Sequence, residues 1–175
     1  MTNRKLIGKI NHRTGERFEH LINYACRIYQ DKEIAEINKA NEPMKPISGK
    51  MPGGWYKAVF TKKSGADYSG LAKGGIPIYF EAKYTSSDRI TYNRVEPQQL
   101  EQLERAEAMG ARCFILVNFE NAGVYRIPLN IWACMGDFFG RLYLKPEDIA
   151  DFKIAEPWQD VYFLSGIVEG GGFDE

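Results

Sequence analysis

The order of its secondary-structure patterns constrains the fold of this chain more than any other feature. Apolar residues recur at three- and four-residue steps from Phe18 to Tyr29, which predicts an amphipathic helix that Thr14 would cap. Glu96-Pro97 opens a second helix that Gly110 ends. Strands are expected at 56–62, 76–83, 112–119 and 124–129, a strand or helix tail at 34–37, and a short helix at 145–151. This order predicts an α/β or α+β domain with a central mixed sheet.

Length and composition favour one globular domain over residues 1–175. The chain has 175 residues, of which 44% are hydrophobic and 26% charged, close to the averages of soluble domains. It contains no run of 18 apolar residues and no apolar segment behind its basic start, so we expect no membrane span and no signal peptide. Its three cysteines lack CxxC or metal-site spacing, which favours free thiols in the cytoplasm.

Charge is distributed unevenly although the formal net charge is zero. Residues 1–63 hold thirteen Lys/Arg and six Asp/Glu, a net charge of +7, and residues 64–175 carry the opposite charge of −7. Such asymmetry is typical of a polyanion-binding half beside an acidic half. Mutual neutralisation of the two halves across the fold is an equally good interpretation at this point.

The segment 41–55, NEPMKPISGKMPGGW, does not have the composition of a regular element. Its three prolines and three glycines exclude a regular helix, and it carries two lysines. A long structureless loop in a compact domain is unusual and often functional. The alternative is an ordinary surface loop.

The strand at 76–83 carries the residues best suited to catalysis. Because side chains alternate along a strand, Ile78, Phe80 and Ala82 are expected to face the core. Glu81 and Lys83 then share the opposite face. A carboxylate can bind Mg²⁺, and a lysine beside it can hold the attacking water and stabilise charge at a phosphate. Asp67 would supply a second carboxylate if a hairpin joins the two segments.

The spacing of these residues is not specific by itself. Glu81 and Lys83 could instead form an ion pair on a solvated sheet face. A second triplet of the same spacing, Asp137 with Asp151 and Lys153, also occurs. It falls in or after the short helix at 145–151, where residues two apart do not share a face, so we discard it.

Four segments together are more specific: GERFEH, GADYSG, YFEAKYT and QQLEQL, in this order. They resemble the RecU family of Holliday junction resolvases of Gram-positive bacteria and their phages. The likeness covers about residues 11–130. It implies a restriction-endonuclease-like α/β fold, with a central mixed sheet flanked by helices and a protruding stalk loop near 41–56.

The resemblance also implies roles for individual residues. Asp67, Glu81 and Gln99 would hold Mg²⁺, with Mn²⁺ as a substitute, and Lys83 would be the transition-state lysine. Glu19 matches an acid of the first helix that leans toward the catalytic site. Contacts with DNA are also expected from Lys45 and Lys50 of the stalk and from Thr85. Three further lysines flank Asp67 in the sequence and would line a DNA backbone, or else form a solvated face: Lys62, Lys63 and Lys73. Gly65 stands where the family often has Thr, and the stalk is shorter than in bacterial members, which indicates a phage-type or divergent member.

The predicted function is Mg²⁺-dependent cleavage of four-way DNA junctions in recombination and repair. A homodimer is expected because a two-fold symmetric junction needs two symmetric nicks. A recombinase or branch-migration protein would be a further partner, in a bacterial cytoplasm or in the host cytoplasm of a phage. Two alternatives stay open: a nuclease acting on flaps, ends or duplex, and a junction-binding factor without catalysis.

Overall fold

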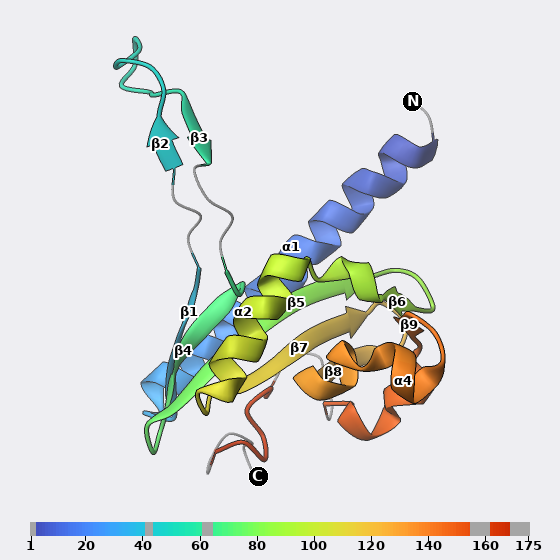
Figure 1. Cartoon of the computed structure of the whole chain (residues 1–175). Helices are drawn as coiled ribbons and strands as arrows, with labels where there is room; N and C mark the ends of the chain where they lie inside the picture. The colour runs from blue at the N-terminus through green and yellow to red at the C-terminus, as the bar shows by residue number, and fades with distance from the viewer. Residues whose placement is uncertain (1–2, 41–43, 61–64, 155–161, 169–175) are drawn as a thin grey trace.

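A five-stranded mixed sheet forms the centre of the molecule (Figure 1). The computed structural model describes residues 3–40, 44–60, 65–154 and 162–168. In spatial order the strands are β1 (Ala35–Lys39), β4 (Tyr68–Ala72), β5 (Ile76–Thr85), β7 (Arg112–Phe119) and β8 (Gly123–Pro128). β5 and β7 run parallel, and the other neighbours are antiparallel.

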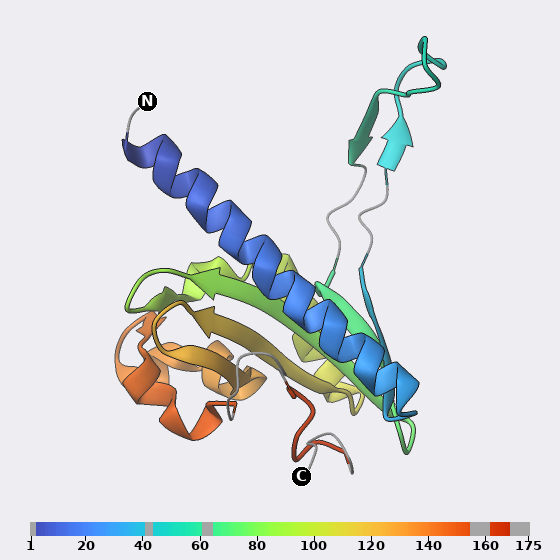
Figure 2. The same cartoon turned by 180° about the vertical axis from the view of Figure 1, so that it is seen from behind.

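Two helices cover the opposite faces of this sheet. The helix α1 (Asn3–Asp31) packs on β1 and β5, and α2 (Pro97–Ala108) packs on β5 and β7. Figures 1 and 2, which differ by half a turn, show one helix in front of the sheet in each view. The core therefore has two apolar clusters, one under each helix. The predicted α/β class, with a mixed sheet flanked by helices, is confirmed.

The remaining elements are short. A two-stranded ribbon, β2 (Met44–Pro46) and β3 (Ala58–Phe60), precedes β4. A second small ribbon pairs β6 (Ile90–Thr91) with β9 (Tyr143–Leu144). The other short elements are helical: η1 (Tyr92–Arg94), α3 (Leu129–Ala133), α4 (Met135–Phe139) and the 3-10 helix η2 (Pro146–Phe152).

The first helix begins earlier than its predicted cap. α1 starts at Asn3, and Thr14 lies inside it. Residues 3–13 contain no proline, and once a helix has formed, each added residue gains a hydrogen bond, so one threonine does not stop it. The predicted apolar stripe is confirmed, since Phe18, Ile22 and Tyr29 are buried. The segment near 34–37 is a strand rather than a helix tail.

The stalk is a β-ribbon rather than a structureless loop. Met44 pairs with Phe60 and Pro46 with Ala58, and the ribbon stands away from the sheet in both views (Figures 1 and 2). We call residues 44–60 the arm. Pro46 ends β2, and backbone pairing continues past it, since the Ile47 N–H donates to the Lys57 carbonyl at 2.8 Å.

A C-terminal segment completes the core in a way that the sequence did not indicate. Phe163 and Leu164 are fully buried under α1. The Leu164 N–H donates to the hydroxyl of Tyr29, and the guanidinium of Arg126 donates to the carbonyls of Phe163 and Ser165. These bonds hold residues 162–168 against the sheet.

Gly70 in β4 is required by the approach of a neighbouring strand. A Cβ at this position would lie 2.0 Å from the carbonyl oxygen of Glu36 and 2.6 Å from the Cα of Ile37. Both are backbone atoms, which cannot move aside without breaking the β1–β4 ladder.

We therefore expect Gly70→Ala to lower the free energy of unfolding by about 1–3 kcal/mol, the usual cost of overpacking. Urea unfolding would measure it. Gly136→Ala is the control, because a Cβ there makes only an ordinary 3.6 Å contact with Leu142. Equal stability of Gly70→Ala and the wild type would contradict this account of the strand.

Within the described ranges, no helix combines the length and apolar character needed to cross a membrane. Cys26, Cys113 and Cys134 are all free thiols, as predicted.

Candidate active site

The hairpin of β4 and β5 brings Asp67 and Glu81 together. Its turn passes through Gly74 and Gly75, both with positive φ. Because Tyr68 pairs with Phe80, Asp67 lies beside Glu81. The Asp67 N–H donates to Glu81 Oε1 at 3.0 Å, and the Ala82 N–H donates to Asp67 Oδ2 at 3.1 Å. The predicted hairpin connection is thus confirmed.

The ammonium of Lys83 connects the two carboxylates. Its Nζ lies 2.6 Å from Glu81 Oε2 and 3.3 Å from Asp67 Oδ2. The Glu81 side chain is completely buried, because α2 covers this face of β5. The alternative of a solvated sheet face is therefore wrong, although the ion pair that it assumed does form.

Gln99 reaches the site because of the way that α2 begins. Its side chain belongs to a capping box, in which Oε1 accepts the N–H of Glu96 at 3.1 Å. The amide nitrogen then points to Glu81 and donates to Oε2 at 2.7 Å. In this arrangement Gln99 holds the carboxylate in place. To offer its oxygen to a metal ion it would have to leave Glu96.

Burial controls the protonation of the site. It raises the pKa of Glu81 to about 8, an effect that Lys83 opposes and the charge of Asp67 increases. Burial alone would lower the pKa of Lys83, but the two carboxylates outweigh it and the pKa is raised. A cation between Asp67 and Glu81 therefore stabilises the state in which both carboxylates are ionised.

The donor set fits a hard divalent cation. The described residues contain no group of three or more His, Cys, Asp or Glu that could hold a metal. Two convergent carboxylates are nevertheless the usual protein contribution to Mg²⁺, which keeps several waters and takes further oxygens from substrate phosphates. The side chain of Asp67 is 30% exposed, so one side of the pair is open to a substrate.

A comparison with known protein families agrees with the motifs. The model of the RecU family, described as Recombination protein U, matches residues 13–135. The chain belongs to the RecU family. The restriction-endonuclease-like class stays what the resemblance of the motifs implies.

Among solved structures, Hjc, a Holliday junction resolvase from the archaeal hyperthermophile Archaeoglobus fulgidus, is similar to this RecU chain. The two share 16% sequence identity with a TM-score of 0.42, over 67% of this chain and 75% of the other. No protein of curated function matches the chain.

Gly65, at which this RecU chain departs from the family pattern, lies against α2. A Cβ at this position would fall within 2.3 Å of the side-chain amide of Gln102. A threonine would therefore require Gln102 to move. Because Gln102 is exposed and flexible, its side chain can move aside, so the close approach does not by itself require glycine.

Glu19 is not joined to the cluster by a described hydrogen bond. Its Oε2 accepts a hydrogen bond of 2.6 Å from Lys39 at the end of β1. It is still close enough to act electrostatically on Tyr68: burial raises the pKa of that tyrosine, and the charges of Glu19 and Asp67 add to the rise. The catalytic role that the family resemblance implies for Glu19 stays a prediction.

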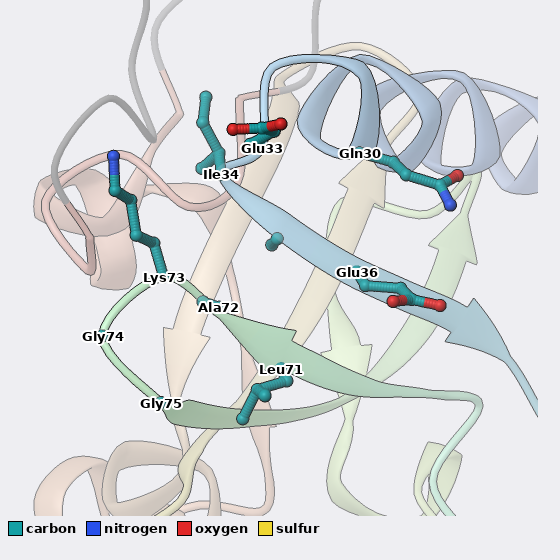
Figure 3. A pocket seen from close by; sticks show the side chains of 10 residues that line it. Gln30, Glu33, Ile34, Glu36, Leu71, Ala72, Lys73, Gly74 and Gly75 are labelled. Atoms are coloured by element: carbon teal, nitrogen blue, oxygen red, sulfur yellow. The ribbon is translucent and has the colours of Figure 1, made fainter.

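The lysines expected to bind DNA are spread over the molecule. Lys45 and Lys50 are exposed on the arm, and Lys62 and Lys63 lie outside the described residues. Lys73 does not flank Asp67 but lies at the other end of β4. There it lines a cavity of about 450 Å³ together with Glu33 and Glu36 (Figure 3).

Thr85 shapes the loop that follows β5. Its hydroxyl donates to the carbonyl of Arg89 at 3.3 Å and accepts the N–H of Ser87 at 3.1 Å. Its predicted DNA contact is untested. Arg94 at the end of the same loop lines a cavity that Lys83 also lines, and it was not singled out by the sequence. Its position just before the helix start at Glu96-Pro97 was the sequence feature that could have indicated Arg94 as a candidate site residue.

Proposed function

We propose that this RecU chain cuts four-way DNA junctions as a Mg²⁺-dependent endodeoxyribonuclease. The observation that carries the proposal is the single ammonium of Lys83 within hydrogen-bonding distance of both Asp67 and Glu81. A member of a recombination family with such a cluster has the groups that phosphodiester hydrolysis needs. A binding protein without catalysis would have no use for a buried carboxylate held by three donors.

Asp67 and Glu81 would hold the metal ion. When bound, Mg²⁺ supplies an activated water and stabilises charge on the leaving oxygen. The buried Glu81 is oriented by Gln99 and by the N–H of Asp67. Asp67 is in turn oriented by the N–H of Ala82. Preorganised groups of this kind lose little free energy to reorganisation during the reaction.

Lys83 would act on the substrate. Its ammonium is positive in this site because the neighbouring carboxylates raise its pKa. A phosphate entering over Asp67 would meet this charge, which stabilises the negative charge that develops as water attacks. Lys83 would contact the phosphate only, so it would not contribute to sequence specificity.

The arm and a homodimer would supply selectivity for junctions. We infer that the arm, with Lys45 and Lys50 exposed, enters the open centre of the junction. Two copies of the chain would place two sites on a two-fold symmetric substrate. Recognition would be by shape and backbone phosphate rather than by base edges. The biological role would be recombination and repair, with a recombinase or branch-migration protein as a partner.

Metal dependence tests this function directly. We expect wild-type protein to nick a four-way junction in Mg²⁺ or Mn²⁺ and to bind it without nicking in Ca²⁺. A gel-based nicking assay on junction, flap and duplex substrates would measure both the rate and the selectivity. Cleavage that persists in excess EDTA would refute the metal site. Equal rates on all three substrates would leave a nuclease of different specificity.

A further inference from the structure

A polar cavity lies beside the proposed active site. Its volume is about 330 Å³, and it is bounded by the end of β5, by the loop 86–94 and by Gly15 of α1. Lys83 belongs both to its wall and to the carboxylate cluster. A group bound in the cavity would therefore be a close neighbour of the phosphate being cut.

The charges of the lining suit an anion. Lys83 and Arg94 line the cavity, and none of the described lining residues is acidic. The guanidinium of Arg94 donates one N–H to the carbonyl of Tyr84 at 2.9 Å, which fixes it against β5. This bond uses one of five donors. Asp88 on the same loop is engaged by Arg89, with Nε 3.0 Å from Oδ1.

Gly15 is the second sign of a ligand. It lies inside the 29-residue helix α1, where glycine costs about 1 kcal/mol relative to alanine. Its φ is not in the left-handed region, and a Cβ there would meet nothing within 4 Å. Neither the backbone nor the packing requires glycine, but a ligand passing close to the helix backbone would.

We propose that this cavity is a phosphate subsite for the DNA strand being cut. It would hold the backbone phosphate next to the scissile one, with Arg94 as its donor and Gly15 leaving room for the strand. The inference depends on the proposed function, because it places a DNA strand over Lys83. Arg94 would be a positioning residue that fixes the register of the strand and touches no reacting atom.

Junction affinity in Ca²⁺ tests the subsite without cleavage. We expect Arg94→Gln to weaken binding about tenfold, as expected for loss of one charge-assisted hydrogen bond. Gly15→Glu should weaken it by a similar factor, because it places bulk and a negative charge in the path of the strand. Each should also reduce the slope of log affinity against log salt by about 0.9, the value of one phosphate. Arg105→Gln is the matched control, since it makes the same charge change on an exposed residue paired with Glu101 on α2. It should leave affinity and slope unchanged.

Neutral linkages locate the phosphate. Junctions with one methylphosphonate on either side of the cleaved bond should bind wild type about tenfold more weakly at one of the two positions. Arg94→Gln should show no further loss there. If the losses caused by the methylphosphonate and by Arg94→Gln were additive, the subsite would be wrong. It would also be wrong if Arg94→Gln and Gly15→Glu bound the junction as well as the control Arg105→Gln does. This second arm holds even if Gly15→Glu disturbs α1.

Two further results complete the test. The first distinguishes a subsite for DNA from a site for free phosphate, and the second distinguishes failure of the subsite from failure of the proposed function. If inorganic phosphate binds in calorimetry and Gly15→Glu abolishes it while DNA affinity is unchanged, the cavity takes the free ion and the proposal is wrong. If wild-type protein fails to cleave in Mg²⁺ but the losses from a neutral linkage and from Arg94→Gln are still not additive, the proposed cleavage is wrong and the cavity is a phosphate subsite for DNA that is bound but not cut.

Discussion

Asp67→Asn and Glu81→Gln should each lower the rate of junction cleavage by several orders of magnitude, because each removes a charge that holds the metal ion. Side-chain volume is kept in both variants. In Glu81→Gln the amide oxygen can still accept hydrogen bonds from Lys83 and Gln99. In Asp67→Asn the amide oxygen can still accept the Ala82 N–H.

Junction binding by both variants should survive or tighten, since one anion facing the phosphates has been removed. Single-turnover nicking in Mg²⁺ and binding in Ca²⁺ measure the two effects separately. Asp151→Asn is the control. Asp151 is exposed in η2 and belongs to the second triplet of the same spacing, which we rejected as a catalytic site from its sequence alone. Wild-type cleavage by Asp67→Asn, or loss of cleavage by Asp151→Asn, would require the site to be moved.

Shortening the arm should lower junction affinity by on the order of ten- to a hundredfold and duplex affinity much less. The design replaces residues 47–57 by Asn-Gly, which can close a two-residue hairpin on the Pro46–Ala58 pair. The lost surface includes Lys50 and the exposed Ile47, Trp55 and Tyr56. Loss of phosphate contacts and of shape complementarity to the junction centre would both weaken binding.

The shortened protein should unfold at nearly the wild-type temperature, because the removed side chains contribute nothing to the two core clusters. Lys50→Gln in an intact arm separates charge from shape. Binding assays with matched junction and duplex give the selectivity. Equal losses on the two DNAs would mean that the arm is an ordinary surface loop.

Local patterns predicted the parts of this molecule that depend on neighbours in the sequence. Alternation placed Glu81 and Lys83 on one face of β5, and their 2.6 Å contact confirms it. Glu96-Pro97 and Gly110 correctly bounded α2, because capping and positive φ are local requirements. The start of α1 was missed for the opposite reason. A helix without a strong stop signal continues past one threonine.

Packing between distant segments decided the burial of individual residues and their distance from the site, which local patterns do not indicate. The exposed Trp55 and the buried Trp132 look alike in sequence, and their surroundings alone distinguish them. Lys73 is six residues from Asp67, but the length of β4 carries it to the other end of the strand. The role of Gly70 appears only when β1 passes within 2.0 Å of its missing Cβ.

The sequence by itself determined the two long helices, the strands β5, β7 and β8, the shared face of Glu81 and Lys83, and the motifs of the family. These follow from strand alternation, helix caps and residue identity, which act over a few positions. The sequence did not predict the strand β4, which pairs with β5. The tertiary structure decided that α2 covers that face, which buries Glu81, raises its pKa and turns the Gln99 amide nitrogen toward it. It also joined Gly15 and Arg94, 79 positions apart, around one cavity. Burial and convergence depend on which distant segments pack together, and no local pattern contains that information.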